Sequence, residues 1–274
     1  MEKVDQIKRI IRQLIDENDF LLAAITIIKQ RDGRLPTIDL SDSIGSVFVT
    51  DRNAIVIGLQ DIIECYNISK RLGCDVEYQF NLKDHSCVLN VVCERFCIIN
   101  VPDNERENIE TILNESDFLN ENETSSDVIA VYSLAYSLYH EFGHVLHDKY
   151  ILNSIKRERT ADAFAFESMK SLRSKEYEKT LLGGIIIGIV NILYKEGLDY
   201  ENKETSHPHG IERLYSLLDF WKIQDYSYYW ELSYRILRKW CTKNSITIDW
   251  EKNTSNTYKD KFFDAYIHFK KDPQ

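Results

Sequence analysis

Apolar residues recur at helical spacing in several stretches of the first half of the chain. Residues 3–18 place their aliphatic side chains on one face of a predicted helix, and residues 59–72 show the same period before Gly73. Residues 20–29 are apolar and rich in isoleucine, which fits either a strand or a buried helix. The Asp-Gly and Leu-Pro steps within residues 31–36 then predict a turn.

Strand-like patterns lie between and after these predicted helices. The β-branched stretches 47–49 and 54–57 predict two short strands, joined at residues 51–53. Residues 76–99 alternate or run apolar in short pieces and supply further candidate strand. Helix and strand are therefore mixed in the first 100 residues.

Residues 103–127 are rich in Asp, Glu, Asn and Ser and predict a flexible connection that contains one short helix. Predicted helices follow one another from there to the end of the chain. We expect an α+β fold that is mostly helical, with a mixed N-terminal part over residues 1–124 and a helical C-terminal part over 125–274. The helices are expected at residues 127–149, 153–173, 176–196, 208–223, 226–242 and 256–270.

Composition and charge restrict the class of protein. The formal net charge of −10 argues against nucleic-acid binding, which normally needs a basic surface. The six cysteines form no C-x-x-C pair and fit free thiols in a reducing compartment. The most apolar run, residues 181–194, is shorter than the ~20 residues that span a bilayer, so we expect a buried core helix. These features, and an N-terminus without the pattern of a signal peptide, predict a cytoplasmic protein without stable membrane insertion.

A candidate metal site lies in the first helix of the C-terminal part, at His140-Glu141-Phe142-Gly143-His144. Positions i and i+4 of a helix lie ~40° apart around the axis, so both imidazoles point the same way and can bind one Zn²⁺. Glu141 lies ~100° from His140 and is placed to act as a general base. Gly143 is unfavourable inside a helix, which predicts a close neighbour at that point, such as a second helix or an edge strand.

A catalytic zinc ion needs a third protein ligand and an open position. Glu158 lies on the next predicted helix, with Asp162 four residues later on the same face. We therefore predict Glu158 as the third ligand. Asp162 then accepts a hydrogen bond from a ligand imidazole and fixes its tautomer and orientation.

These two motifs, His140-Glu141-x-x-His144 and Glu158-x-x-x-Asp162, resemble those of the gluzincin metallopeptidases. Within that clan the sequence resembles the Lit-type phage-exclusion metallopeptidases over roughly residues 130–220. The resemblance implies a cytosolic zinc endopeptidase that cuts an intact intracellular protein in phage exclusion or toxicity. A translation factor is the substrate class that it suggests, and an activating or inhibiting protein or peptide is a further candidate partner.

A third stretch, with His207-Pro208 and Arg213, resembles a downstream gluzincin motif. In that interpretation His207 donates a hydrogen bond to the oxyanion of the tetrahedral intermediate. Arg213 pairs with an acidic residue of the site, for which Glu158 is the candidate, and His209 is an alternative donor. His147 lies on the same helix face as His140. We expect it to lie behind the ligands or at the rim of the site, and not to bind the metal.

Two other classes fit parts of the sequence. The ImmA/IrrE type of repressor-cleaving metallopeptidase has a similar His-Glu helix, and residues 161–165 resemble its second helix. The His207 to Arg213 segment and the absence of an evident helix-turn-helix favour the Lit-type interpretation. A non-catalytic zinc-binding regulatory module is the remaining alternative, although structural zinc sites usually have four protein ligands, often cysteines.

Overall fold

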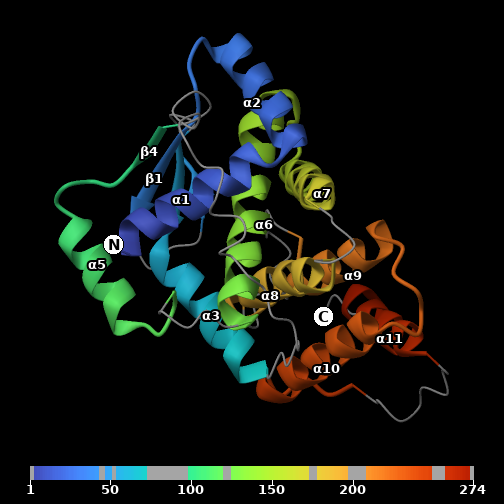
Figure 1. Cartoon of the computed structure of the whole chain (residues 1–274). Helices are drawn as coiled ribbons and strands as arrows, with labels where there is room; N and C mark the ends of the chain where they lie inside the picture. The colour runs from blue at the N-terminus through green and yellow to red at the C-terminus, as the bar shows by residue number, and fades with distance from the viewer. Residues whose placement is uncertain are drawn as a thin grey trace. The chain divides into compact units, whose positions relative to one another are not determined.

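The computed structural model describes residues 3–42, 47–50, 54–72, 98–119, 125–172, 178–196, 208–248 and 257–271. The chain packs as two compact units, Met1–Gly188 and Ile189–Gln274. The division between them falls inside one long helix, while the division expected near residue 124 lies within the first unit. The fold is α+β and mostly helical, as the sequence predicts (Figure 1).

Within the described residues, the first unit contains a sheet of four strands in the order β2-β3-β1-β4. Strand β1 pairs in parallel with β3 and β4, whereas β2 pairs antiparallel with β3 at the edge. The predicted strands around residues 48 and 55 are confirmed as β2 and β3, and β4 lies at the end of the stretch 76–99, whose residues 76–97 are outside the described residues. Strand β1 was not predicted from the sequence. The strands are β1 (Thr37–Ser41), β2 (Phe48–Val49), β3 (Ala54–Gly58) and β4 (Ile98–Asn100).

Helices make up the rest of the described first unit. Residues 20–29, for which the sequence allowed either a strand or a helix, lie in helix α2. This helix begins after the Asn18 cap and ends before Gly33. Gly33 has φ +70°, a left-handed conformation that glycine adopts without strain. The described helices of this unit are α1 (Lys3–Asp16), α2 (Asp19–Asp32), α3 (Leu59–Leu72), α5 (Arg106–Glu115), α6 (Ser125–His147), the 3₁₀ turn η2 (Asp148–Tyr150), α7 (Ser154–Ser171) and α8 (Glu178–Glu196), whose last turns belong to the second unit.

Helix α6 is the central element of the first unit (Figure 1). It packs most extensively against α7, then against α3, and it also contacts α2, the edge strand β2 and its neighbour β3. Most of its side chains are buried, including Tyr136, Tyr139 and Phe142. The hydroxyl of Tyr139 donates to the carbonyl oxygen of Leu14 at 2.6 Å, which ties α6 to α1. A helix buried on several sides gives its polar side chains a rigid, dry setting.

Helix α8 approaches α6 closely because glycine faces it. A Cβ atom on Gly184 would overlap the Cβ atom of Tyr132, and the hydroxyl of Ser133 donates to the carbonyl oxygen of Gly184 at 2.7 Å. The apolar run of helix α8 is almost entirely buried, which confirms the predicted core helix. Within the described residues, no helix has both the length and the apolar composition needed to cross a membrane.

The second unit has a core of aromatic side chains. Trp230, Trp240 and Phe262 are fully buried, and the indole of Trp240 donates to the carbonyl oxygen of Leu193 at 3.2 Å. Helices α9 and α10 begin at capping side chains, those of His209 and Ser227. The described helices that begin in this unit are α9 (Gly210–Phe220), α10 (Tyr228–Lys243) and α11 (Tyr258–Lys271).

Candidate metal centre and active site

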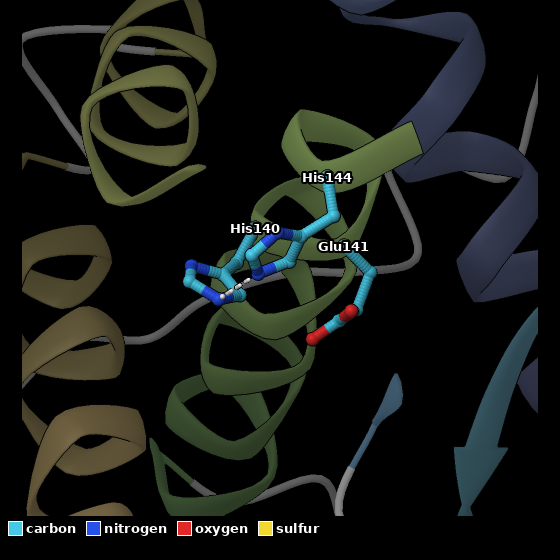
Figure 2. Close-up of side chains that lie close together, drawn as sticks. All are labelled: His140, Glu141 and His144. Atoms are coloured by element: carbon cyan, nitrogen blue, oxygen red, sulfur yellow. Dashed lines mark hydrogen bonds between the residues drawn. The ribbon is translucent and has the colours of Figure 1, made fainter. Parts of the chain in front are cut away.

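His140, Glu141 and His144 lie in the C-terminal half of α6, near the packing face for α7. The two imidazole rings meet edge to face, and their Nε2 atoms lie 3.0 Å apart (Figure 2). One imidazole nitrogen from each histidine and one carboxylate oxygen of Glu141 all lie within 4.8 Å of one another. His140 and Glu141 are each only 8% exposed. The spacing of the motif on a continuous helix therefore produces the predicted cluster.

Glu158 reaches the same point from α7. Its Oε2 atom lies 3.3 Å from His140 Nε2, and its Oε1 atom lies 3.3 Å from His144 Nε2. Zinc bonds of ~2.0–2.1 Å in a tetrahedron place ligand atoms about 3.3–3.4 Å apart. Two imidazole nitrogens and the two oxygens of one carboxylate thus meet at separations close to those around a zinc ion, and nitrogen and oxygen are donors that zinc accepts.

A close contact between glycine and alanine sets the distance between the two helices. A Cβ atom on Gly143 would lie 2.8 Å from Ala161 Cα, closer than side-chain carbons approach backbone. The expected close neighbour of Gly143 is therefore the second helix. Because Ala161 follows Glu158 by three residues on α7, this contact also determines how near the Glu158 carboxylate comes to the imidazoles.

Each of the two imidazoles has a carboxylate at its other nitrogen. His140 Nδ1 lies 3.0 Å from Asp162 Oδ1, which also accepts a hydrogen bond from the Tyr136 hydroxyl at 2.9 Å. His144 Nδ1 lies 3.0 Å from Asp148 Oδ1. Asp162 was predicted beside an imidazole from the sequence, whereas Tyr136 and Asp148 were not predicted. The signal was present, since Tyr136 precedes His140 by one helical turn and Asp148 follows His144 by one.

An ionised carboxylate and two imidazoles share the centre. Burial alone would raise the pKa of Glu158, but hydrogen bonds from His140 and His144 outweigh burial and hold this pKa far below its ordinary value. Burial likewise opposes a charged His144, but the hydrogen bonds to Glu158 and Asp148, together with the charge of Glu141, outweigh it and raise the pKa of this imidazole. When both Nδ1 atoms carry their protons toward aspartates, both Nε2 lone pairs face Glu158. These acceptors repel one another unless a proton or a metal ion lies among them.

The other site residues that the sequence suggests are His207, Arg213 and His209. His207 lies outside the described residues. Arg213 is buried on α9 in the second unit, where its Nε donates to the carbonyl oxygen of Pro208 at 3.3 Å. His209 caps α9, its Nδ1 accepting from the backbone N–H of Ile211 at 3.3 Å, and burial lowers its pKa to about 4. The roles predicted for His207 and Arg213 stay predictions.

His147 lies one turn beyond His144, at the end of α6. Its ring meets the ring of Phe164 edge to face, with centroids 6.1 Å apart, and partial burial lowers its pKa. The centre described above uses the nitrogens of His140 and His144 instead. The interpretation of His147 as a residue beside the site, and not a ligand, stays a prediction.

Comparison with known proteins supports a peptidase. Residues 101–233, just under half of the chain, match the family model described as Peptidase U49. The matched segment contains the whole His140 to Asp162 cluster and also His207 and Arg213. No curated protein and no solved structure matches the chain. The match agrees, at the level of a peptidase, with the Lit-type resemblance of the sequence.

Proposed function

We propose that this protein is a zinc-dependent endopeptidase whose metal ligands are His140, His144 and Glu158. The observation that carries the proposal is the convergence of two imidazole Nε2 atoms and one carboxylate within 3.0–3.3 Å of one another. Three protein ligands leave the fourth position of a tetrahedral ion open, as catalytic zinc sites require. The Peptidase U49 match supports the hydrolysis of peptide bonds as the chemistry.

A zinc ion at this point supplies Lewis acidity, making water acidic enough to attack near neutral pH and polarising a carbonyl group. Glu141 is the general base. Its carboxylate takes a proton from the water whose oxygen bonds to the scissile carbonyl carbon, and it then delivers that proton to the amine nitrogen as the C–N bond breaks. Burial of Glu141 keeps competing water away from this transfer.

The side chains around the ligands support the chemistry by holding them still. Asp162 lies against the Nδ1 atom of His140, an arrangement that would leave the Nε2 lone pair free to hold a metal ion. The Tyr136 hydroxyl holds the same Asp162 oxygen. This buried pair resists rotation of the His140 ring, which keeps the ligand geometry fixed while substrate binds and product leaves.

The proposed substrate is an intact intracellular protein, cleaved in phage exclusion or toxicity, and a translation factor is the leading class. The Lit-type resemblance supports this substrate, and the protein is expected to act in the cytoplasm. An ImmA/IrrE-type enzyme would instead cleave a DNA-binding repressor. The sequence of the cleaved protein therefore separates the two candidates.

The test compares cells that express the wild type with cells that express Glu141→Gln, by mass spectrometry of newly formed protein N-termini. Loss of a general base costs about 10²–10⁴-fold in rate, so the wild-type cleavage products should disappear. Glu167→Gln is the matched control, because it removes one exposed carboxylate further along α7 and should leave cleavage intact. Identical new N-termini from Glu141→Gln would refute the mechanism.

A further inference from the structure

Asp148 stands against the second metal-binding imidazole in the way that Asp162 stands against the first. It begins the 3₁₀ turn η2, directly after α6, and its Oδ1 atom lies 3.0 Å from His144 Nδ1. The two aspartates differ in setting. The Asp162 side chain is 7% exposed and hydrogen-bonded by Tyr136, whereas the Asp148 side chain is 35% exposed.

The fold alone does not account for a carboxylate at this position. The carbonyl end of a helix carries partial negative charge, which disfavours an acidic side chain there and favours a basic one. Asp148 follows the last residue of the 23-residue helix α6, so its charge is unfavourable for the helix. Two groups compensate for it: the His144 imidazole, and Arg157, whose Nη1 atom lies 3.9 Å from Asp148 Oδ2.

We propose that Asp148 is a positioning residue for His144. By accepting the Nδ1–H hydrogen bond it selects the tautomer with a free Nε2 lone pair and fixes the ring toward Glu158. Arg157 precedes Glu158 on α7, so the Arg157–Asp148 pair also joins the start of that helix to η2. Asp148 acts through His144 and has no role in proton transfer. The proposal rests on the proposed function, since it concerns the same metal centre.

The test measures zinc affinity of the full-length protein by competition with a chromophoric chelator. Loss of such a partner typically weakens metal binding 10- to 100-fold. Because water reaches Asp148, we expect about tenfold for Asp148→Ala and about 100-fold for Asp162→Ala. Asp148→Asn keeps an oxygen that can accept the same hydrogen bond, and should recover most of the lost affinity. Glu167→Gln controls for the loss of one negative charge.

Two further readouts separate positioning from a role in the fold. The visible absorption of the Co²⁺-substituted protein should change in Asp148→Ala, because the His144 ring is less constrained. The unfolding midpoint of the metal-free variant should stay level or rise, because an unfavourable charge is removed from the helix end. A midpoint that falls together with the affinity would assign Asp148 to the fold and overturn the proposal.

Affinity within twofold of the wild type in Asp148→Ala would also overturn it. So would an Asp148→Asn variant as weak as Asp148→Ala, because the accepted hydrogen bond would then not be the cause. Failure of the wild type itself to bind zinc is a different result. It would refute the proposed metal centre, and with it the proposed role of Asp148 in positioning His144.

Discussion

Replacing Gly143 by alanine tests whether the contact between α6 and α7 sets the metal centre. The new Cβ atom would lie 2.8 Å from Ala161 Cα, whereas carbon atoms in contact sit about 3.5–4.0 Å apart. The helices must therefore separate by about 1 Å. Glu158 moves with α7, and metal sites tolerate displacements of only about 0.2 Å. We expect Gly143→Ala to weaken zinc binding at least tenfold.

The stability of the metal-free variant should change less than its zinc affinity. Overpacking lowers the free energy of unfolding by about 1–3 kcal/mol, whereas alanine in place of a helical glycine raises it by about 1 kcal/mol. The net loss therefore lies between nearly zero and about 2 kcal/mol. Zinc at 100 times its dissociation constant stabilises the wild type by about 2.7 kcal/mol, and a tenfold loss of affinity removes about half of that.

The assay is thermal unfolding with and without added zinc, together with chelator competition. In a unit of this size 2.7 kcal/mol corresponds to roughly 5–10 °C, so the zinc-induced rise should shrink by about half. Gly183→Ala is the matched control, because a Cβ atom on this α8 glycine meets nothing within 4 Å. It should raise the unfolding temperature and leave zinc affinity unchanged. A Gly143→Ala protein with wild-type zinc affinity would refute the reasoning.

Two other substitutions test the remaining assignments. Glu158→Ala should lose more zinc than Asp162→Ala in elemental analysis, because it removes a ligand and not the partner of one; the reverse order would exchange their roles. His209→Asn should flatten the acid dependence of stability, measured by tryptophan fluorescence in denaturant at each pH. The fold keeps His209 neutral down to about pH 4, while the unfolded chain takes up a proton below about 6.5. Stability present above pH 6.5 is therefore lost as pH falls toward 4, by about 3 kcal/mol, and asparagine keeps the helix cap without titrating. An unchanged acid dependence would contradict this origin.

The sequence predicts the first half of the candidate site well because one helix contains it. The separation of His140 and His144 by one turn fixes their common direction without any knowledge of tertiary structure. The proximity of Glu158 to the two histidines could not be predicted from one helix alone, because it depends on how closely two helices pack. Gly143 was the local signal for that packing, because an unfavourable helical glycine indicates a close neighbour.

The sheet shows where prediction from local pattern ends. Residues 37–41 alternate polar and apolar side chains, a period-two signal that fits a half-buried strand. This signal covers only five residues, and the strands that pair with β1, namely β3 and β4, lie elsewhere along the chain. Parallel pairing of this kind leaves no hairpin turn in the sequence to reveal it. Asp148 was not predicted although it follows His144 by one helical turn, because its contact depends on how the ring of His144 is oriented, which the helical pattern alone does not give.

Zinc content, with identification of the ligands, tests the central claim most directly. Purified wild type and Glu141→Gln should each contain one zinc ion per chain, with X-ray absorption showing only nitrogen and oxygen neighbours at about 2.0–2.2 Å. His140→Ala and His144→Ala should contain much less zinc under the same conditions. A wild type without zinc, or equal zinc in the two histidine variants, would contradict the metal centre on which the account depends.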